Sequence, residues 1–196
     1  MKKIKERKLV VILVLLVIII SILFYYINIT TNHLVLCLQH ISIEMKSVAF
    51  DVNGYLIALN SNDLSPEEVN EKISILLFLM SDLTGSFQTE AMKFKINQPL
   101  IASKNKEIDN NRSKFLNELI AIDRYLSLQK SINNHNNFQH SNEYKEIVAK
   151  FENLHLQTER LVEYLDSKNK YIIILGILNP NSYLKTIIND IFASIL

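Results

Sequence analysis

The chain has 196 residues, 48% of them hydrophobic, and contains only three Gly, three Pro, one Cys and no Trp. Gly and Pro supply many tight turns, so their scarcity excludes a fold of short strands joined by hairpins. The 21 Lys and Arg residues nearly balance the 20 Asp and Glu residues, which leaves no basic excess to attract nucleic acid. We therefore predict an all-α protein with no nucleic-acid partner.

Residues 9–29 are predicted to form a transmembrane anchor. Ser21 is the only residue between Leu9 and Ile27 that is not apolar, and a helix over this run is about 28 Å long, close to the thickness of a bilayer's hydrocarbon core. The apolar part of a cleaved signal peptide is usually shorter, and Tyr25 and Tyr26 suit a membrane interface. The sequence favours an uncleaved anchor, with a cleaved signal as the alternative.

Charge on the two sides of this run predicts its orientation. Basic residues precede the run and none follows it before Lys46; they are Lys2, Lys3, Lys5, Arg7 and Lys8. Because loops rich in Lys and Arg stay in the cytoplasm, residues 1–8 are predicted to be a cytoplasmic basic tail. The expected location is the bacterial inner (cytoplasmic) membrane, with a single pass and a periplasmic or extracellular C-terminal domain.

After the anchor, apolar residues recur at alternating spacings of four and three, which is typical of packed helices. The first series contains Leu34, Leu38, Ile41, Met45, Val48, Val52, Tyr55 and Leu59. Helices are predicted over about 30–60, 66–96, 108–132 and 142–169. Similar lengths and short connections favour an exported up-down four-helix bundle over 30–170. Coiled-coil pairing with another chain is the alternative.

Local signals mark the ends of the predicted second helix. Ser65 can cap it, Pro66 suits its first position, and Glu68 completes a capping box. Pro99 disfavours helix in the residue before it. We therefore expect this helix to begin at Pro66 and to end before Pro99.

Residues 171–196 form an apolar and amphipathic tail. The apolar stretch before Asn179 is too short to span a bilayer, and Ser182 can cap a segment with apolar residues on one side. We predict a membrane-proximal helix that lies at the interface or packs on the bundle. A second span is the alternative, against which Asn179, Pro180, Lys185 and Asp190 weigh.

Two features of the sequence are candidate binding sites. His33, Cys37, His40 and Glu44 are ligand types that zinc or copper accepts, and their spacing places them on one helix face. A single straight helix rarely completes a four-coordinate shell, so a polar flank is the competing interpretation. Arg112 extends the stripe of Phe115, where it either contacts an anionic ligand or forms a salt bridge at the rim.

Sequence motifs of catalysis are missing from the chain. It contains no glycine-rich phosphate loop, no nucleophile elbow, no pair of Glu-x-x-His motifs as in di-iron bundles and no Cys/His finger spacing. We therefore expect no enzyme activity, no catalytic residue and no cofactor.

Two segments carry a resemblance to a known group of proteins. Leu38–Leu59, followed by Ser65–Gly85 with the core Ile73-Ser74-Ile75-Leu76-Leu77-Phe78-Leu79-Met80-Ser81-Asp82-Leu83-Thr84-Gly85, resembles the helical periplasmic sensor regions of bacterial signalling proteins. Those proteins include histidine kinases, chemoreceptors and diguanylate cyclases or phosphodiesterases. The resemblance covers about 50 residues. In the sensor pattern, a polar turn precedes a helix with a short Asp-Ile-Leu-Trp-Ser-Arg-like core. This chain has neither that Trp nor that Arg, so the resemblance assigns no binding residue. No output domain is evident.

The expected function follows from the anchor and the helices. We expect a single-pass membrane protein whose extracytoplasmic helical module is sensor-like or accessory and acts without catalysis. Its expected partner is another membrane protein or a second copy joined through the helical seams. The alternatives are a bitopic coiled-coil component of a cell-envelope assembly and a truncated signalling receptor.

Overall fold

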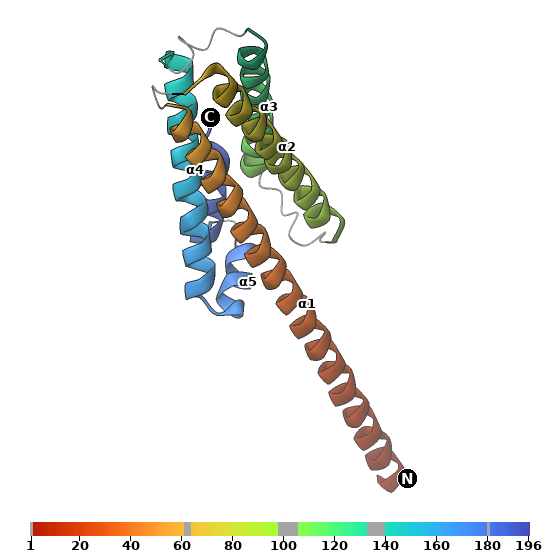
Figure 1. Ribbon diagram of the computed structural model, residues 1–196. Coiled ribbons are helices and arrows are strands. Elements are labelled where there is room, and N and C mark those ends of the chain that lie inside the picture. The colour runs from red at the N-terminus through yellow and green to blue at the C-terminus, as the bar shows by residue number, and fades with distance from the viewer. Residues whose placement is uncertain (1, 61–63, 98–105, 133–139, 180) are drawn as a thin grey trace. The chain divides into compact units, whose positions relative to one another are not determined.

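The computed structural model describes residues 2–60, 64–97, 106–132, 140–179 and 181–196. These ranges contain six helices and no strand, in the order α1 (Lys2–Leu59), α2 (Pro66–Asn97), α3 (Lys106–Ile132), α4 (Asn142–Ser167), α5 (Lys170–Leu178) and α6 (Tyr183–Ala193) (Figure 1). The predicted all-α class is confirmed. Pro99 and Pro180 lie outside the described residues.

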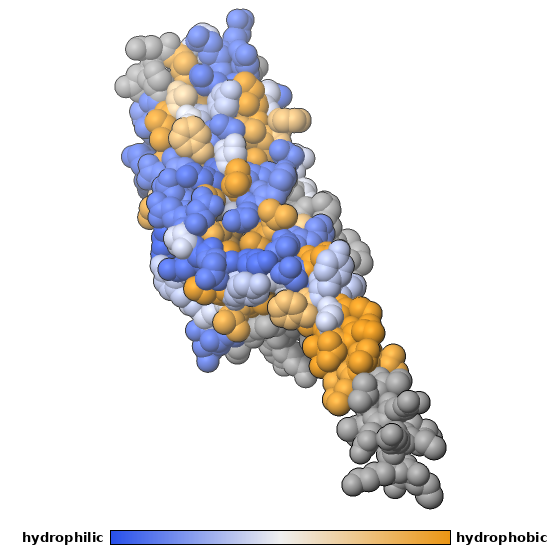
Figure 2. Space-filling view, turned by 90° about the horizontal axis from the view of Figure 1, so that it is seen from below, coloured by the Kyte–Doolittle hydropathy of each residue, from blue (hydrophilic) through white to orange (hydrophobic). Residues whose placement is uncertain are grey.

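The chain forms two compact units, Met1–Leu38 and Gln39–Leu196. The first unit consists of the N-terminal part of α1, and its described apolar side chains from Leu13 to Ile29 are all exposed. They form the continuous hydrophobic stretch of Figure 2. This helix is long and apolar enough to cross a membrane, as the sequence predicts. Residues 171–196 belong to the second unit.

In the second unit, the buried stripe of α1 differs in register from the predicted one. Met45, Val48, Val52 and Leu59 are buried as expected, but Ile41 and Tyr55 are only half-buried. Ser42, Ala49 and Leu56 are buried in addition. A straight helix has 3.6 residues per turn, so its buried face drifts away from a strict seven-residue repeat. Ile41 and Tyr55, which the seven-residue repeat predicts in the stripe, therefore lie half-buried at its edge.

Two neighbouring helices explain the width of that stripe. On one side, the Lys72 ammonium of α2 lies 6.0 Å from the centre of the Tyr55 ring. On the other side, the Tyr144 hydroxyl of α4 donates a hydrogen bond to the Leu56 carbonyl. Because α1 packs between α2 and α4, it buries more than the narrow seam of a two-stranded coiled coil.

Apolar residues recur at spacings of four and three in α2, α3 and α4 as well, and they are buried wherever the structure describes them. Their buried residues are Val69, Ile73, Leu76, Met80 and Leu83 in α2, Phe115, Leu119, Ile122 and Leu126 in α3, and Ile147, Phe151, Leu154, Thr158, Leu161 and Leu165 in α4. α2 begins with the predicted capping box: the Ser65 amide donates to Glu68 Oε2 at 2.8 Å, and the Glu68 amide donates to Ser65 Oγ at 3.3 Å. These hydrogen bonds hold the pKa of Glu68 below its ordinary value.

The structure does not confirm a bundle of only four helices, because α6 adds a further helix to the core. α6 packs against both α3 and α4 and buries Leu184, Ile187 and Ile191. Pairs at its two ends show that it runs antiparallel to α4: Tyr164 with Tyr183, and Asn153 with Ser194. The tail thus contains a bundle-packed helix, and α5 and α6 have 9 and 11 residues, too few for a second span.

Candidate functional site

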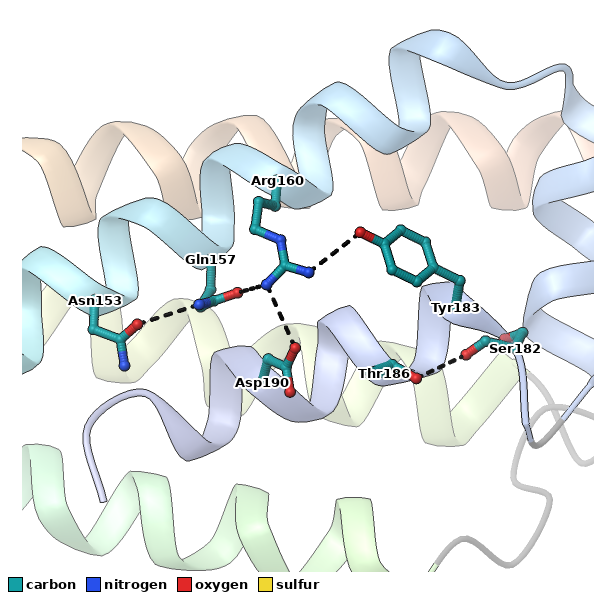
Figure 3. Close-up of polar contacts among 7 residues, drawn as sticks. All are labelled: Asn153, Gln157, Arg160, Ser182, Tyr183, Thr186 and Asp190. Atoms are coloured by element: carbon teal, nitrogen blue, oxygen red, sulfur yellow. Dashed lines mark hydrogen bonds and ion pairs between the residues drawn. The ribbon is translucent and has the colours of Figure 1, made fainter.

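A row of polar side chains connects α4 to α6 (Figure 3). On α4, Gln157 Nε2 donates to Asn153 Oδ1 at 3.2 Å, and Arg160 Nη1 donates to Gln157 Oε1 at 2.5 Å. The guanidinium then reaches α6, where Nη2 donates to the Tyr183 hydroxyl at 3.2 Å and Nη1 lies 3.6 Å from Asp190 Oδ2. We call these five residues the Arg160 cluster.

The local sequence explains how the cluster forms. Asn153, Gln157 and Arg160 follow one another at spacings of four and three, so they lie on one side of α4 beside its buried stripe. Tyr183 and Asp190 are seven residues apart, about two turns, and so share one side of α6. α4 and α6 pack side by side and antiparallel. The polar side of α4 therefore faces the polar side of α6 next to their buried contact.

The cluster is a set of polar contacts that joins α4 to α6. The hydrogen bond to Tyr183 raises the pKa of Arg160, and Asp190 acts in the same direction, so the guanidinium stays charged. The Arg160 and Asp190 side chains are 36% and 38% exposed, and ion pairs this accessible contribute at most about 1 kcal/mol. The cluster contains no pairing of a nucleophile with a base.

The interface between α1 and α4 carries a second set of polar contacts. Lys46 Nζ donates to Glu159 Oε1 at 3.0 Å, which lowers the pKa of that carboxyl group. One turn further on, the Phe50 and His155 rings are 5.4 Å apart. His155 Nδ1 is buried without a hydrogen-bond partner among the described residues.

The structure places the four predicted metal ligands in two separate pairs on α1. Cys37 Sγ lies 3.8 Å from His33 Nε2, and His40 Nδ1 lies 3.8 Å from Glu44 Oε2. All four residues are exposed. Within the described parts of the chain, no group of three or more His, Cys, Asp or Glu side chains could hold a metal ion. Among the described residues, no second helix adds a His, Cys, Asp or Glu ligand to either pair.

Arg112 is half-buried near the start of α3, one turn before the buried Phe115. The adjacent Asn111 donates to Asn189 Oδ1 of α6 at 2.9 Å, so this end of α3 is joined to the tail helix. A role of Arg112 in ligand binding stays a prediction.

The sequence does not predict the Arg160 cluster. Its periodicity predicts four bundle helices that end with α4 and leaves the tail helix either at the membrane interface or on the bundle, so the polar residues beside the α4 stripe had no defined partner. Asp190 was noted only as a charge that disfavours a membrane span. The seven-residue separation of Tyr183 and Asp190 indicates that they share one side of a helix. It does not indicate that this side contacts Arg160, which requires α6 to pack on α4.

Comparison with known proteins adds no assignment to this description. No protein-family model, curated protein or solved structure matches the chain. The resemblance to periplasmic sensor regions therefore stays a prediction.

Proposed function

We propose that this chain is a single-pass membrane protein whose extracytoplasmic helical unit is a sensor-like or accessory binding module that acts through a partner. The observation that carries the proposal is α1, one helix that is wholly apolar and exposed from Leu13 to Ile20 and continues to Leu59 in the second unit. Each Å² of apolar surface costs about 25 cal/mol in water. A bilayer removes that cost.

Flanking charge supports the orientation of the anchor. Lys and Arg cluster before the apolar run, and the next basic residue, Lys46, lies in the second unit. By the positive-inside rule, the N-terminus is cytoplasmic and the second unit lies on the outer side of a bacterial inner membrane. On this topology the helical unit is exposed to extracytoplasmic ligands or partners.

A role without catalysis fits the polar groups between the helices. Arg160 is engaged by Gln157, Tyr183 and Asp190. Lys150 bridges Glu118 and Glu146 at 2.8 and 2.9 Å. These charged groups hold helices together, whereas a catalytic site needs a group poised toward a substrate.

Cys37 provides a test of this topology because it is the only cysteine and is exposed. We expect a membrane-impermeant maleimide to label the full chain in intact bacterial spheroplasts, and the chain to resist extraction by alkaline carbonate. The matched control is Lys3→Cys in a Cys37→Ser background, which should be labelled only after permeabilisation. Carbonate extraction, or the reverse labelling pattern, would overturn the proposal.

A further inference from the structure

α5 is a short helix that is apolar on all sides, yet one of its sides is exposed. From residue 171 to residue 178 it contains no charged residue. Its buried side is formed by Ile173, Gly176 and Ile177. Its exposed side is formed by Tyr171, Ile172 and Leu175, which are 56%, 44% and 65% exposed. We call these three exposed residues the α5 face.

The α5 face lacks the polar side chains that a helix on a protein surface normally presents to water. The last exposed residues of α4, Asp166 and Ser167, follow that rule. A helix that is apolar on all sides is instead typical of a protein interior or a membrane. The α5 face is therefore suited to apolar surroundings on the side that faces away from the core.

The contacts between α1 and α4 place α5 at the end of the second unit where α1 enters it. Lys46 of α1 contacts Glu159 of α4. Four residues further along α1, the Phe50 ring contacts the ring of His155, which lies four residues back in α4. The two helices are therefore antiparallel. α4 ends about two turns beyond Glu159, and α5 begins after two more residues (Figure 1).

Along the chain, this end of the second unit is close to the proposed anchor. α1 is one helix, and ten residues of it lead from Ile29 in the exposed apolar run to Gln39 at the start of the second unit. Ten residues of helix are about 15 Å long, and the headgroup region of a bilayer leaflet is itself about 5–8 Å thick. The remaining gap is about 10 Å, and the tilt of about 20° that is common for spanning helices narrows it on one side.

We propose that the α5 face lies in the headgroup region of the bilayer that holds the anchor. The inference rests on the proposed function, because only an anchored chain brings this end of the second unit to a membrane. Tyrosine is enriched at membrane interfaces, where its ring meets apolar groups and its hydroxyl meets water, so Tyr171 suits this position. Ile172 and Leu175 add apolar contact area, and the α5 face fixes the side toward which α1 tilts.

The charges near the α5 face predict how this contact depends on lipid. Lys168 lies over the Tyr164 ring and Lys170 over the Tyr171 ring, with ammonium-to-centre distances of 6.0 and 5.0 Å. Glu163 and Asp166 are exposed on the last turns of α4, so the charges at this end nearly balance. Attraction to anionic lipid therefore contributes little, and we expect a zwitterionic bilayer to support the contact.

Fluorescence quenching in vesicles tests the proposal. The full chain in a Cys37→Ser background receives one nitrobenzoxadiazole label and is reconstituted into phosphatidylcholine vesicles, with or without lipid that is spin-labelled near the headgroup. We expect quenching at Leu175→Cys to be at least threefold stronger than at Leu128→Cys. Equal quenching at the two positions would overturn the inference and leave the α5 face to a protein partner.

Leu128 is a matched control because it is 60% exposed and belongs to the opposite end of the second unit. One turn before it on α3, the Tyr125 hydroxyl lies 3.0 Å from Ser141 Oγ at the start of α4. A label at Ile22→Cys tests the anchor itself. Quenching at Ile22 without quenching at Leu175 would overturn the inference and leave the proposed anchor standing. Absence of quenching at Ile22 would overturn both.

A disrupting variant gives a second readout. In a chain labelled at Tyr171→Cys, Ile172→Ser with Leu175→Ser should reduce quenching at least twofold, whereas Leu128→Ser should leave it unchanged. Circular dichroism should show the same helical content in each variant, because the substituted residues are exposed. Adding phosphatidylserine should change the quenching of the parent chain less than twofold. Quenching that appears only with phosphatidylserine would overturn a contact made by apolar side chains.

Discussion

The two ends of the chain are both apolar, yet the apolar side chains are exposed at the N-terminal end and buried in α6 at the C-terminal end. The described apolar residues of α1 from Leu13 to Ile29 are exposed, whereas α6 buries Leu184, Ile187 and Ile191 against α3 and α4. The N-terminal run is apolar on all sides, so no single neighbouring helix could cover it. α6 has one apolar side and a polar side with Asp190, so it can pack on protein. The comparison shows that the pattern of apolar residues, more than their number, determines which surroundings a segment needs.

The largest expected effect concerns the N-terminal end. Replacing Ile18 and Ile19 together with lysine should remove the chain from the membrane, because each lysine at the centre of a spanning helix costs about 2.5–3.5 kcal/mol. Flotation with membranes measures the loss, and Ile18→Leu with Ile19→Leu is the matched control. Unchanged flotation of the lysine variant would show that this run does not anchor the chain, and the contrast with α6 would then fail.

At the other end, Ile187→Ala should destabilise the folded second unit by about 2–5 kcal/mol, because Ile187 is fully buried in α6 and its truncation leaves a cavity. Urea unfolding of the full chain in detergent, followed by circular dichroism, measures the change. Ile22→Ala in the exposed run should leave the transition within about 0.5 kcal/mol of wild type. Similar losses in both variants would remove the distinction between the two ends.

Two glycines allow a test of how closely α5 approaches α6. A Cβ on Gly176 of α5 would lie 3.3 Å from Leu184 Cβ of α6, whereas a Cβ on Gly85 of α2 would meet nothing within 4 Å. Gly85→Ala should stabilise the fold by about 1 kcal/mol through helix propensity. Gly176→Ala should be about 1–3 kcal/mol less stable than Gly85→Ala, because the added methyl group crowds the contact between α5 and α6. Equal stabilities in thermal unfolding would contradict this close approach.

The Arg160 cluster should contribute less than the apolar contacts of α6. Arg160→Ala should cost about 0.5–1 kcal/mol, as is typical of partly exposed ion pairs, and should speed hydrogen exchange in α6 more than in α2. A double-mutant cycle with Asp190→Asn isolates the coupling between the two side chains. Equal acceleration of hydrogen exchange in all helices would contradict a role of Arg160 in stabilising α6 locally.

The smallest expected effect is a pH dependence at the start of α2. The folded-state pKa of Glu68 lies below its ordinary value of 4.5 because of hydrogen bonds from Ser65. Its contribution to stability is therefore present above pH 4.5 and is lost as the pH falls through the folded-state pKa. Between pH 7 and pH 3, Glu68→Gln should lose slightly less thermal stability than wild type. Parallel curves for the two proteins would show that the cap carries no pH dependence.

Local signals made several parts of the fold predictable. Ser65, Pro66 and Glu68 form the expected helix start because a capping box involves only neighbouring residues. The stripes of α2, α3 and α4 followed from helical periodicity. The exchange of Ile41 and Tyr55 for Ser42 and Leu56 in α1 was not predictable in the same way, since it depends on the direction from which α2 and α4 approach.

The candidate sites were less predictable than the helices. The predicted metal ligands on α1 have a suitable spacing in the sequence. In the structure they form only two pairs, Cys37 with His33 and His40 with Glu44. The Arg160 cluster joins residues of two helices whose contact no local signal reports. Periodicity indicates which side of a helix is polar, but it does not identify the helix that this side meets.

By itself, the sequence determined the helical class, the helix that can cross a membrane and the start of α2, because propensity, length and capping act over a few neighbouring residues. Only the tertiary structure decided that α6 joins the core, that Arg160 meets Tyr183 and Asp190, and that the face of α1 with Ile43, Phe50 and Ile57 stays exposed. These outcomes depend on which stripes cover one another. Residues far apart in the chain compete for the same buried surface, and only the packed fold settles that competition.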